Sequence, residues 1–362
     1  GPILDIVYLM SNYSSLDQIL HKLFLGKSAL SDFFYKRLIK QKNNKTIFNL
    51  ANHVFITGLA RAGTTSLLNK IYSSNEIPSI TYNHMPFILS PFLANLFNKY
   101  ISNQSGGFIE RFHNDGIKIN IDSPECLDES FWVKAFPELV NQEFITLRNI
   151  PNKLLIGYSK LLYNHARFQN STRLLIKNNN NHIRLFDLVR FFPKAYFLVM
   201  VRNPLAHSKS LLNQNINFIK IQKQNSFVLD YMNYLGHYEF GLNSKTFVYD
   251  LKKNNQILNK DKKKIEYWLI QWIESYRWIL ESGILNKKNV FLINYEELCN
   301  DDSVYKIICE IIGIRNSNSG LPFVSSNFKY NKNLFEINES LLDLSMNIYE
   351  ELIKKSISNF SA

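Results

Sequence analysis

Hydrophobic positions along the chain alternate between two periods, and this alternation predicts the class of fold. Four short segments are apolar at nearly every position, as in strands that are buried on both faces; they are His53–Thr57, Arg173–Ile176, Ala195–Val201 and Val290–Ile293. Each is followed by apolar residues at helical spacing; these helices begin near Gly63, Ile183, Pro204 and Tyr295. Strands alternating with helices favour a parallel sheet covered on both faces. We therefore expect an α/β fold with a central parallel sheet flanked by helices.

The predicted sheet lies in the middle of the chain, and we expect one domain spanning residues 1–362. An α/β core over 53–300 follows a helical segment, 1–50, and precedes another, 301–362. The stretch 214–259 is rich in Tyr, Asn and Lys, and we interpret it as an insertion in the core. Helical spacing also predicts helices over 86–99, 126–136, 151–168, 262–282 and 339–356, and a second short strand is expected at Ser79–Tyr82.

Composition narrows the class of protein. Hydrophobic residues make up 46% and aromatic residues 14% of the 362 positions, which excludes a disordered chain. The formal net charge of +12 points to an anionic partner: nucleic acid, a membrane surface, an acidic polymer or a polyphosphate cofactor. No apolar run approaches the roughly 18 residues of a membrane span. Three cysteines without metal-like spacing are expected to be reduced thiols, which fits a cytoplasmic compartment.

A glycine-containing loop joins the first strand to its helix, and it reads Gly58-Leu59-Ala60-Arg61-Ala62-Gly63-Thr64-Thr65. Its glycines allow a tight turn and close approach to a ligand, and the helix start offers N–H groups and partial positive charge to a phosphate. The spacing is similar to that of a Walker A loop, but Thr64 occupies the position of the Walker lysine. The cation is instead Arg61, two positions before Gly63.

A second strand end also carries a cation. Ala195–Val201 is followed directly by Arg202, and Pro204 opens a helix at a position that needs no N–H. Ser210 lies eight positions after Arg202. The forked guanidinium group matches phosphate oxygens, and the helix start adds N–H donors. A further cation, Lys177, follows the strand Arg173–Ile176.

Together these segments resemble those of sulfotransferases that use 3′-phosphoadenosine 5′-phosphosulfate (PAPS), in the bacterial-type branch with a P-loop-like fold. In that family a loop of Lys or Arg, a small residue, Gly, Thr and Thr binds the 5′-phosphosulfate. An arginine at a strand end and a serine eight residues later bind the 3′-phosphate. The resemblance implies that PAPS, or its product adenosine 3′,5′-bisphosphate (PAP), is held without a metal by Arg61, Ala62, Gly63, Thr64, Thr65, Ser66, Lys177, Arg202 and Ser210.

The resemblance extends over roughly residues 53–300, with weaker likenesses in six segments: Tyr82–Phe87, Glu110–Gly116, Ser123–Glu125, Leu175–Asn178, Phe192–Ala195 and Asn294–Leu298. It implies in-line transfer of a sulfuryl group to an acceptor hydroxyl, with Arg61 on the leaving oxygen and a general base on the acceptor proton. His84 lies near the position expected for the base, where the bacterial branch leads us to expect an acidic residue. His113 and Asp115, in the glycine-flanked loop 106–116, compete with it.

Two other classes of protein remain as alternatives. A P-loop-like nucleotide kinase would lack the Walker lysine that contacts the β- and γ-phosphates. A nucleic-acid binding module could use basic runs such as Lys262–Lys264, but a solvated helix face is the more common explanation of such a run, and we expect no specific nucleic-acid partner. If the chain is a sulfotransferase, its excess of basic over acidic residues favours a carbohydrate or glycolipid acceptor. A small metabolite or a tyrosine or phenol is the alternative. The aromatic residues of 227–249 could stack on sugar rings or fill a core.

Overall fold

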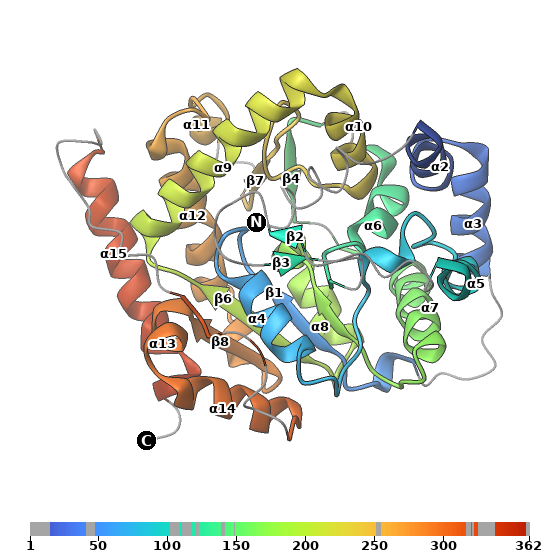
Figure 1. Cartoon of the computed structure of the whole chain (residues 1–362). Helices are drawn as coiled ribbons and strands as arrows, with labels where there is room; N and C mark the ends of the chain where they lie inside the picture. The colour runs from blue at the N-terminus through green and yellow to red at the C-terminus, as the bar shows by residue number, and fades with distance from the viewer. Residues whose placement is uncertain are drawn as a thin grey trace.

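Four parallel strands form the central sheet of the computed structural model, in the order β5–β1–β6–β8 (Figure 1). Their bounds are Val54–Thr57 for β1, Leu175–Lys177 for β5, Tyr196–Val201 for β6 and Val290–Asn294 for β8. In the register, Val54 pairs with both Leu175 and Tyr196. The prediction of a parallel sheet flanked by helices is confirmed.

The structure describes residues 15–40, 48–101, 109–110, 118–119, 123–138, 142–147, 149–250, 255–315, 320, 322–324 and 337–359. Its α-helices are α2 (Ser15–Phe24), α3 (Ala29–Lys40), α4 (Thr64–Tyr72), α5 (Pro91–Ile101), α6 (Glu129–Ala135), α7 (Asn152–Phe168), α8 (Leu185–Phe191), α9 (Pro204–Gln224), α10 (Ser226–Leu235), α11 (Asn255–Leu258), α12 (Ile265–Glu281), α13 (Tyr295–Asn300), α14 (Asp302–Ile312) and α15 (Glu339–Ile353). Short 3₁₀ turns occupy Phe48–Leu50, Tyr82–His84 (η2), Asn179–Arg184 (η4), Ile284–Asn286 and Ile357–Asn359. Two smaller sheets pair β2 (Ile109–Glu110) with β3 (Lys118–Ile119), and β4 (Phe144–Thr146) with β7 (Thr246–Val248).

Helices cover both faces of the central sheet because the side chains of each strand alternate between the faces. Phe55 and Phe197 stack on each other on one face, where α7, α8, α12 and α15 contribute to the same core. Ile56 and Leu198 lie on the other face, against α4 and α14. This accounts for strands that are apolar throughout: each has a core on both sides.

The segment 214–259 contributes extensively to the core. Its first residues continue α9, which packs on α12, and β7 pairs with β4. Its aromatic side chains are mostly buried, among them Tyr231, Tyr238, Phe240 and Phe247. These four rings therefore serve as core, and the structure gives no support to the idea that they form an exposed surface for stacking on sugars.

Two predicted elements are wrong in part. Ser79–Tyr82 makes only isolated bridges, at Ser79 and Thr81, and Tyr82 already starts a 3₁₀ turn. The helix expected over 86–99 begins five residues late, at Pro91. Turns at Phe87 and Ser90 precede it, and proline is favoured at the first position of a helix because it lacks the N–H.

Candidate functional site

The loop between β1 and α4 has the backbone geometry of a tight cradle. Arg61 and Gly63 adopt left-handed conformations, with φ of 72° and 94°. A Cβ atom on Gly63 would lie 2.2 Å from the ring of Tyr295, so no larger residue fits between the loop and α13. The first N–H groups of a helix have no acceptor within the helix, and Gly63 offers no side chain to cap those of α4. The loop thus presents main-chain donors at the carboxyl edge of the sheet.

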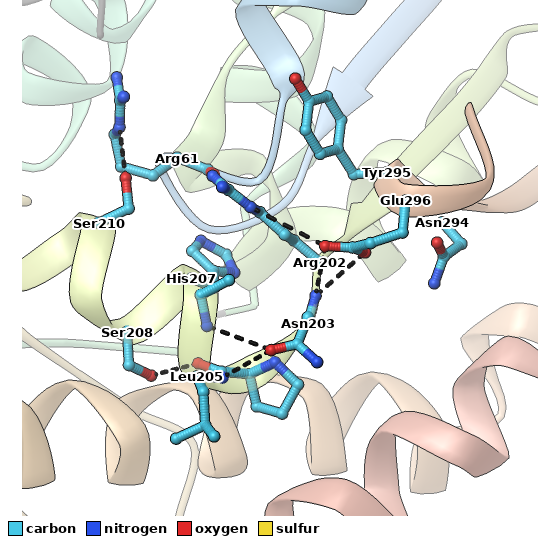
Figure 2. A network of polar contacts seen from close by, with 12 residues as sticks. Arg61, Arg202, Asn203, Leu205, His207, Ser208, Ser210, Asn294, Tyr295 and Glu296 are labelled. Atoms are coloured by element: carbon cyan, nitrogen blue, oxygen red, sulfur yellow. Dashed lines mark hydrogen bonds and ion pairs between the residues drawn. The ribbon is translucent and has the colours of Figure 1, made fainter. Parts of the chain in front are cut away.

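The two phosphate motifs of the sequence meet at this edge. Arg61 donates from Nε to the hydroxyl of Ser210 on α9, at 3.1 Å. Arg202, at the end of β6, donates from Nη1 to the main-chain carbonyl of Arg61, at 3.0 Å. Figure 2 shows the two guanidinium groups and Ser210 arranged around the loop. Three residues predicted to hold one ligand therefore lie in one hydrogen-bonded group.

A carboxylate from α13 completes the surroundings of Arg202. Oε1 of Glu296 lies 4.0 Å from Nε of Arg202, and the ring of Tyr295 lies 5.4 Å from the guanidinium carbon (Figure 2). Both carboxylate oxygens of Glu296 accept from the main-chain N–H of Asn203, and Tyr349 on α15 donates to Oε2 at 2.8 Å. Asn203 in turn caps α9. Apart from the likeness of Asn294–Leu298 to the family, no pattern in the sequence predicts this arrangement.

A buried histidine fixes the loop from the other side. Nε2 of His207 donates to the carbonyl of Ala60 at 2.7 Å. Burial lowers the pKa of His207 to about 3, and the nearby charges of Arg202 and Arg61 act in the same direction. His207 is therefore neutral at physiological pH and serves to hold the loop.

Lys177, predicted to contact the cofactor, is paired with a carboxylate. Its Nζ lies 2.7 Å from Oε1 of Glu125, and both side chains are buried. The same oxygen of Glu125 accepts from the N–H of Cys126. Lys177 does end a strand beside β1, as the sequence predicts, but its charge is balanced within the protein. Glu125 belongs to the segment Ser123–Glu125, which resembles the family but has no role that the sequence predicts.

Asn179, two positions after Lys177, forms hydrogen bonds with the phosphate loop and the end of β1. Its side-chain oxygen accepts from the hydroxyl of Thr64, at 3.0 Å, and its carbonyl accepts from the hydroxyl of Thr57. The hydroxyl of Thr64 thus points toward η4, while its main-chain N–H lies in the first turn of α4. Thr65 and Ser66 occupy the same turn and are partly exposed.

A further buried pair lies near Lys177. Nδ1 of His237 is 3.6 Å from Oε2 of Glu239, and in the part of the chain that the structure describes, neither carboxylate oxygen has a hydrogen-bond partner. Burial acts to raise the pKa of Glu239, but His237 and Lys177 more than offset it, so the pKa lies below its usual range. A buried carboxylate that stays ionised without a hydrogen-bond partner is unusual, and this makes Glu239 a candidate for function. No pattern in the sequence marks it.

The predicted bases differ in how far the structure describes them. His84 is buried in η2, where its Nδ1 accepts from the N–H of Thr81 at 3.1 Å and its ring meets that of His165. The chain at Thr81 bridges to Pro124, next to Glu125, so His84 belongs to the β5 side of the site. His113 and Asp115 lie outside the described residues.

Comparison with known proteins gives matches among solved structures only. The matching structures include three bacterial sulfotransferases, the family whose motifs the sequence resembles. Sulfotransferase STF1 from Mycobacterium tuberculosis H37Rv is 13% identical, with 87% of this chain and 82% of that chain covered and a TM-score of 0.44. STF9 from Mycobacterium avium is 12% identical, with coverage of 92% and 83% and a TM-score of 0.45. The sulfotransferase domain of the Synechococcus PCC 7002 olefin synthase is 15% identical, with coverage of 89% and 99% and a TM-score of 0.33.

No family model and no curated protein matches the chain. At identities of 12–15% the similar structures assign no activity to it. Among the described residues, no group of three His, Cys, Asp or Glu side chains could hold a metal ion, and no helix is long and apolar enough to cross a membrane. All three cysteines are free thiols, as the sequence predicts.

Proposed function

We propose that this chain transfers a sulfuryl group from PAPS to an acceptor hydroxyl. The observation that carries the proposal is the bond between Arg61 and Ser210. It joins the cation of the predicted 5′-phosphosulfate loop to the serine of the predicted 3′-phosphate site, across 149 positions of sequence. A ligand with two phosphate ends could contact both motifs at once.

The residues present fit such a ligand. The N–H groups at the start of α4 and the side chain of Arg61 would hold the 5′-phosphosulfate. Arg202 and Ser210 would hold the 3′-phosphate; Ser210 accepts from Arg61, which leaves its own O–H able to donate. Arg202 is only 9% exposed, so its charge acts in surroundings where screening by water is weak. PAPS, when bound, supplies a sulfuryl group on a phosphate leaving group.

The protein must then remove one proton. The acceptor oxygen forms a bond to sulfur while the bond from sulfur to the 5′-phosphate oxygen breaks, and the acceptor proton passes to a base. His84, His113 and Asp115, the candidates from the sequence, stay our candidates for this base. Arg61 would stabilise the negative charge on the leaving oxygen.

For the acceptor, we propose a carbohydrate or glycolipid hydroxyl, since a net charge of +12 suits an anionic glycan. A small metabolite or a phenol is the alternative acceptor. We propose a reducing, cytoplasmic compartment, which the three free thiols support.

Calorimetry with PAP, ATP and AMP tests the proposal. We expect PAP to bind at least about tenfold more tightly than AMP, because only PAP reaches Arg202 through a 3′-phosphate. We also expect binding of PAP to be independent of magnesium. Preference for ATP with magnesium would instead support a nucleotide kinase. Salt-sensitive binding of DNA without any binding of PAP would support a nucleic-acid module.

A further inference from the structure

Helices α2 and α3 carry large apolar side chains on their outer surface. Leu16, Ile19 and Leu23 follow one another at spacings of three and four on α2, and are 65%, 53% and 40% exposed. Leu30 and Phe33 lie three positions apart on α3 and are 37% and 53% exposed. We call these five residues the N-terminal apolar face. Residues three or four apart share one side of a helix, so each helix has an apolar side that the described part of the chain leaves exposed.

The two helices are firmly attached by their other sides. Phe24 packs edge-on against Phe87, with ring centroids 4.6 Å apart, and the ring of His21 meets that of Tyr231 on α10. Lys134 binds both the carbonyl of Gly26, between the helices, and the carboxylate of Asp32. Figure 1 shows α2 and α3 at one edge of the molecule. The N-terminal apolar face is therefore a fixed surface, and it is apolar where a helix of a protein in water normally carries polar residues.

Positive charge predominates among the exposed side chains of this segment. Five basic residues lie in 15–40, against the acidic Asp17 and Asp32, and Lys134 already neutralises Asp32. The basic residues are exposed, and they are Lys22, Lys27, Lys36, Arg37 and Lys40. Burial lowers the pKa of His21 to about 4, so this histidine adds no charge at neutral pH. An occupant of the face must therefore be both apolar and anionic.

We propose that the N-terminal apolar face docks this protein on an anionic membrane surface. Apolar side chains flanked by Lys and Arg on a helix are suited to the boundary between headgroups and acyl chains. With 10 and 12 residues, α2 and α3 are too short to cross a bilayer, so they would lie in its surface. This docking is separate from PAPS binding and holds whether or not the proposed reaction is correct.

Co-sedimentation with lipid vesicles tests the inference. We expect the full chain to bind phosphatidylcholine vesicles that contain phosphatidylglycerol, and to bind phosphatidylcholine alone, or either vesicle at raised salt, much more weakly. The triple variant Leu16→Ser, Ile19→Ser, Leu23→Ser should lose at least about tenfold in partitioning, because each leucine or isoleucine contributes buried apolar area. Lys22→Glu with Lys36→Glu should remove the preference for phosphatidylglycerol.

A matched control comes from apolar residues that are exposed elsewhere. Ile216 and Leu242 are 46% and 47% exposed, and Ile216→Ser with Leu242→Ser should bind vesicles like the wild type. PAP affinity should be the same in all these variants, which separates this test from that of the reaction. The inference is overturned if the wild type ignores anionic vesicles, or if the triple variant binds them equally well. It is also overturned if the triple variant merely converts a dimer to a monomer, because the face would then contact a second copy of the chain.

Discussion

The guanidinium of Arg202 donates from Nη1 to the main-chain carbonyl of Arg61, with 3.0 Å between nitrogen and oxygen. The bond leaves the side chain of Arg61 to reach Ser210. It fixes the end of β6 against the loop that follows β1, so the two cations are set relative to each other before any ligand binds. Such preorganisation reduces the cost of orienting charged groups during a reaction.

Replacing Arg61 should abolish transfer. In Arg61→Ala the carbonyl that Arg202 contacts remains, but the charge facing the leaving oxygen is lost. We expect a drop of about 100-fold or more in the rate of transfer from labelled PAPS to a panel of octyl glycosides and phenols. Arg190→Ala removes an exposed arginine that pairs with Asp187 and should have no effect. Full activity in Arg61→Ala would disprove the role given to Arg61.

Replacing Arg202 should chiefly weaken binding of the 3′-phosphate. We expect Arg202→Ala to bind PAP about 10- to 100-fold more weakly in calorimetry, the usual loss for hydrogen bonds to a charged group. AMP has no 3′-phosphate, so its affinity should change little. Equal losses for PAP and AMP would show that Arg202 supports the loop as a whole and contacts no 3′-phosphate.

Glu296 should set the preference for PAP over AMP without touching either ligand. Its carboxylate accepts from Asn203 and Tyr349, so in Glu296→Gln the amide NH₂ must face one of these donors. We expect the ratio of PAP to AMP affinity to fall about fivefold, the equivalent of one hydrogen bond. Tyr349→Phe should lower the ratio in the same direction.

The neighbouring carboxylate provides the control for Glu296. Glu297 accepts from the hydroxyls of Ser356 and Ser358, on the chain after α15. Both hydroxyls donate to Oε2, so the amide oxygen in Glu297→Gln can still accept from them, and this variant should leave the ratio of PAP to AMP affinity unchanged. If both glutamine variants change the ratio alike, Glu296 has no specific effect on Arg202.

Stability should fall in mild acid, in part through His207. Its pKa is about 3 in the folded chain and about 6.5 when unfolded, so the unfolded chain binds more protons as the pH falls below about 6.5. The stabilisation is complete above that pH and is lost progressively as the pH falls toward 3. Buried His53, His165 and His182 act with the same sign.

Urea unfolding between pH 7 and 5 would measure this contribution. An amide at position 207 can still donate to Ala60 but does not titrate. We therefore expect His207→Gln to reduce the pH dependence of the unfolding free energy by up to about 1.4 kcal/mol per pH unit. An unchanged slope would mean that His207 is charged in the folded chain.

The sequence predicted the parts of the site that depend on strand ends. Arg61, Arg202 and Ser210 follow apolar strands at fixed spacing, and the carboxyl ends of parallel strands share one edge of the sheet. Partners that come from distant segments could not be predicted. Glu125 lies 52 positions from Lys177, and no periodicity relates them. The position of Glu239 depends on how the chain packs after α10. Its neighbours in the sequence are aromatic residues, which are equally common in a hydrophobic core.

Removing only one partner of the buried pair of Lys177 and Glu125 should lower the free energy of unfolding substantially. Glu125→Leu would leave the Lys177 ammonium buried without its carboxylate, and we expect a loss of about 3–5 kcal/mol in the free energy of unfolding. Glu125→Leu with Lys177→Met removes both charges and should lose much less. The partly exposed pair of Lys260 and Glu266 is the control, and Glu266→Ala should cost at most about 1 kcal/mol.

The same variant tests whether Lys177 faces the cofactor. In Glu125→Leu the ammonium of Lys177 is no longer neutralised, so PAP should bind more tightly than in the wild type if its phosphates lie within reach of Lys177. An unchanged affinity for PAP would place Lys177 outside the cofactor site, with a purely structural role in holding Glu125 and the N–H of Cys126. If Glu125→Leu lowers the free energy of unfolding by as little as Glu266→Ala does, water reaches the pair of Lys177 and Glu125 in solution.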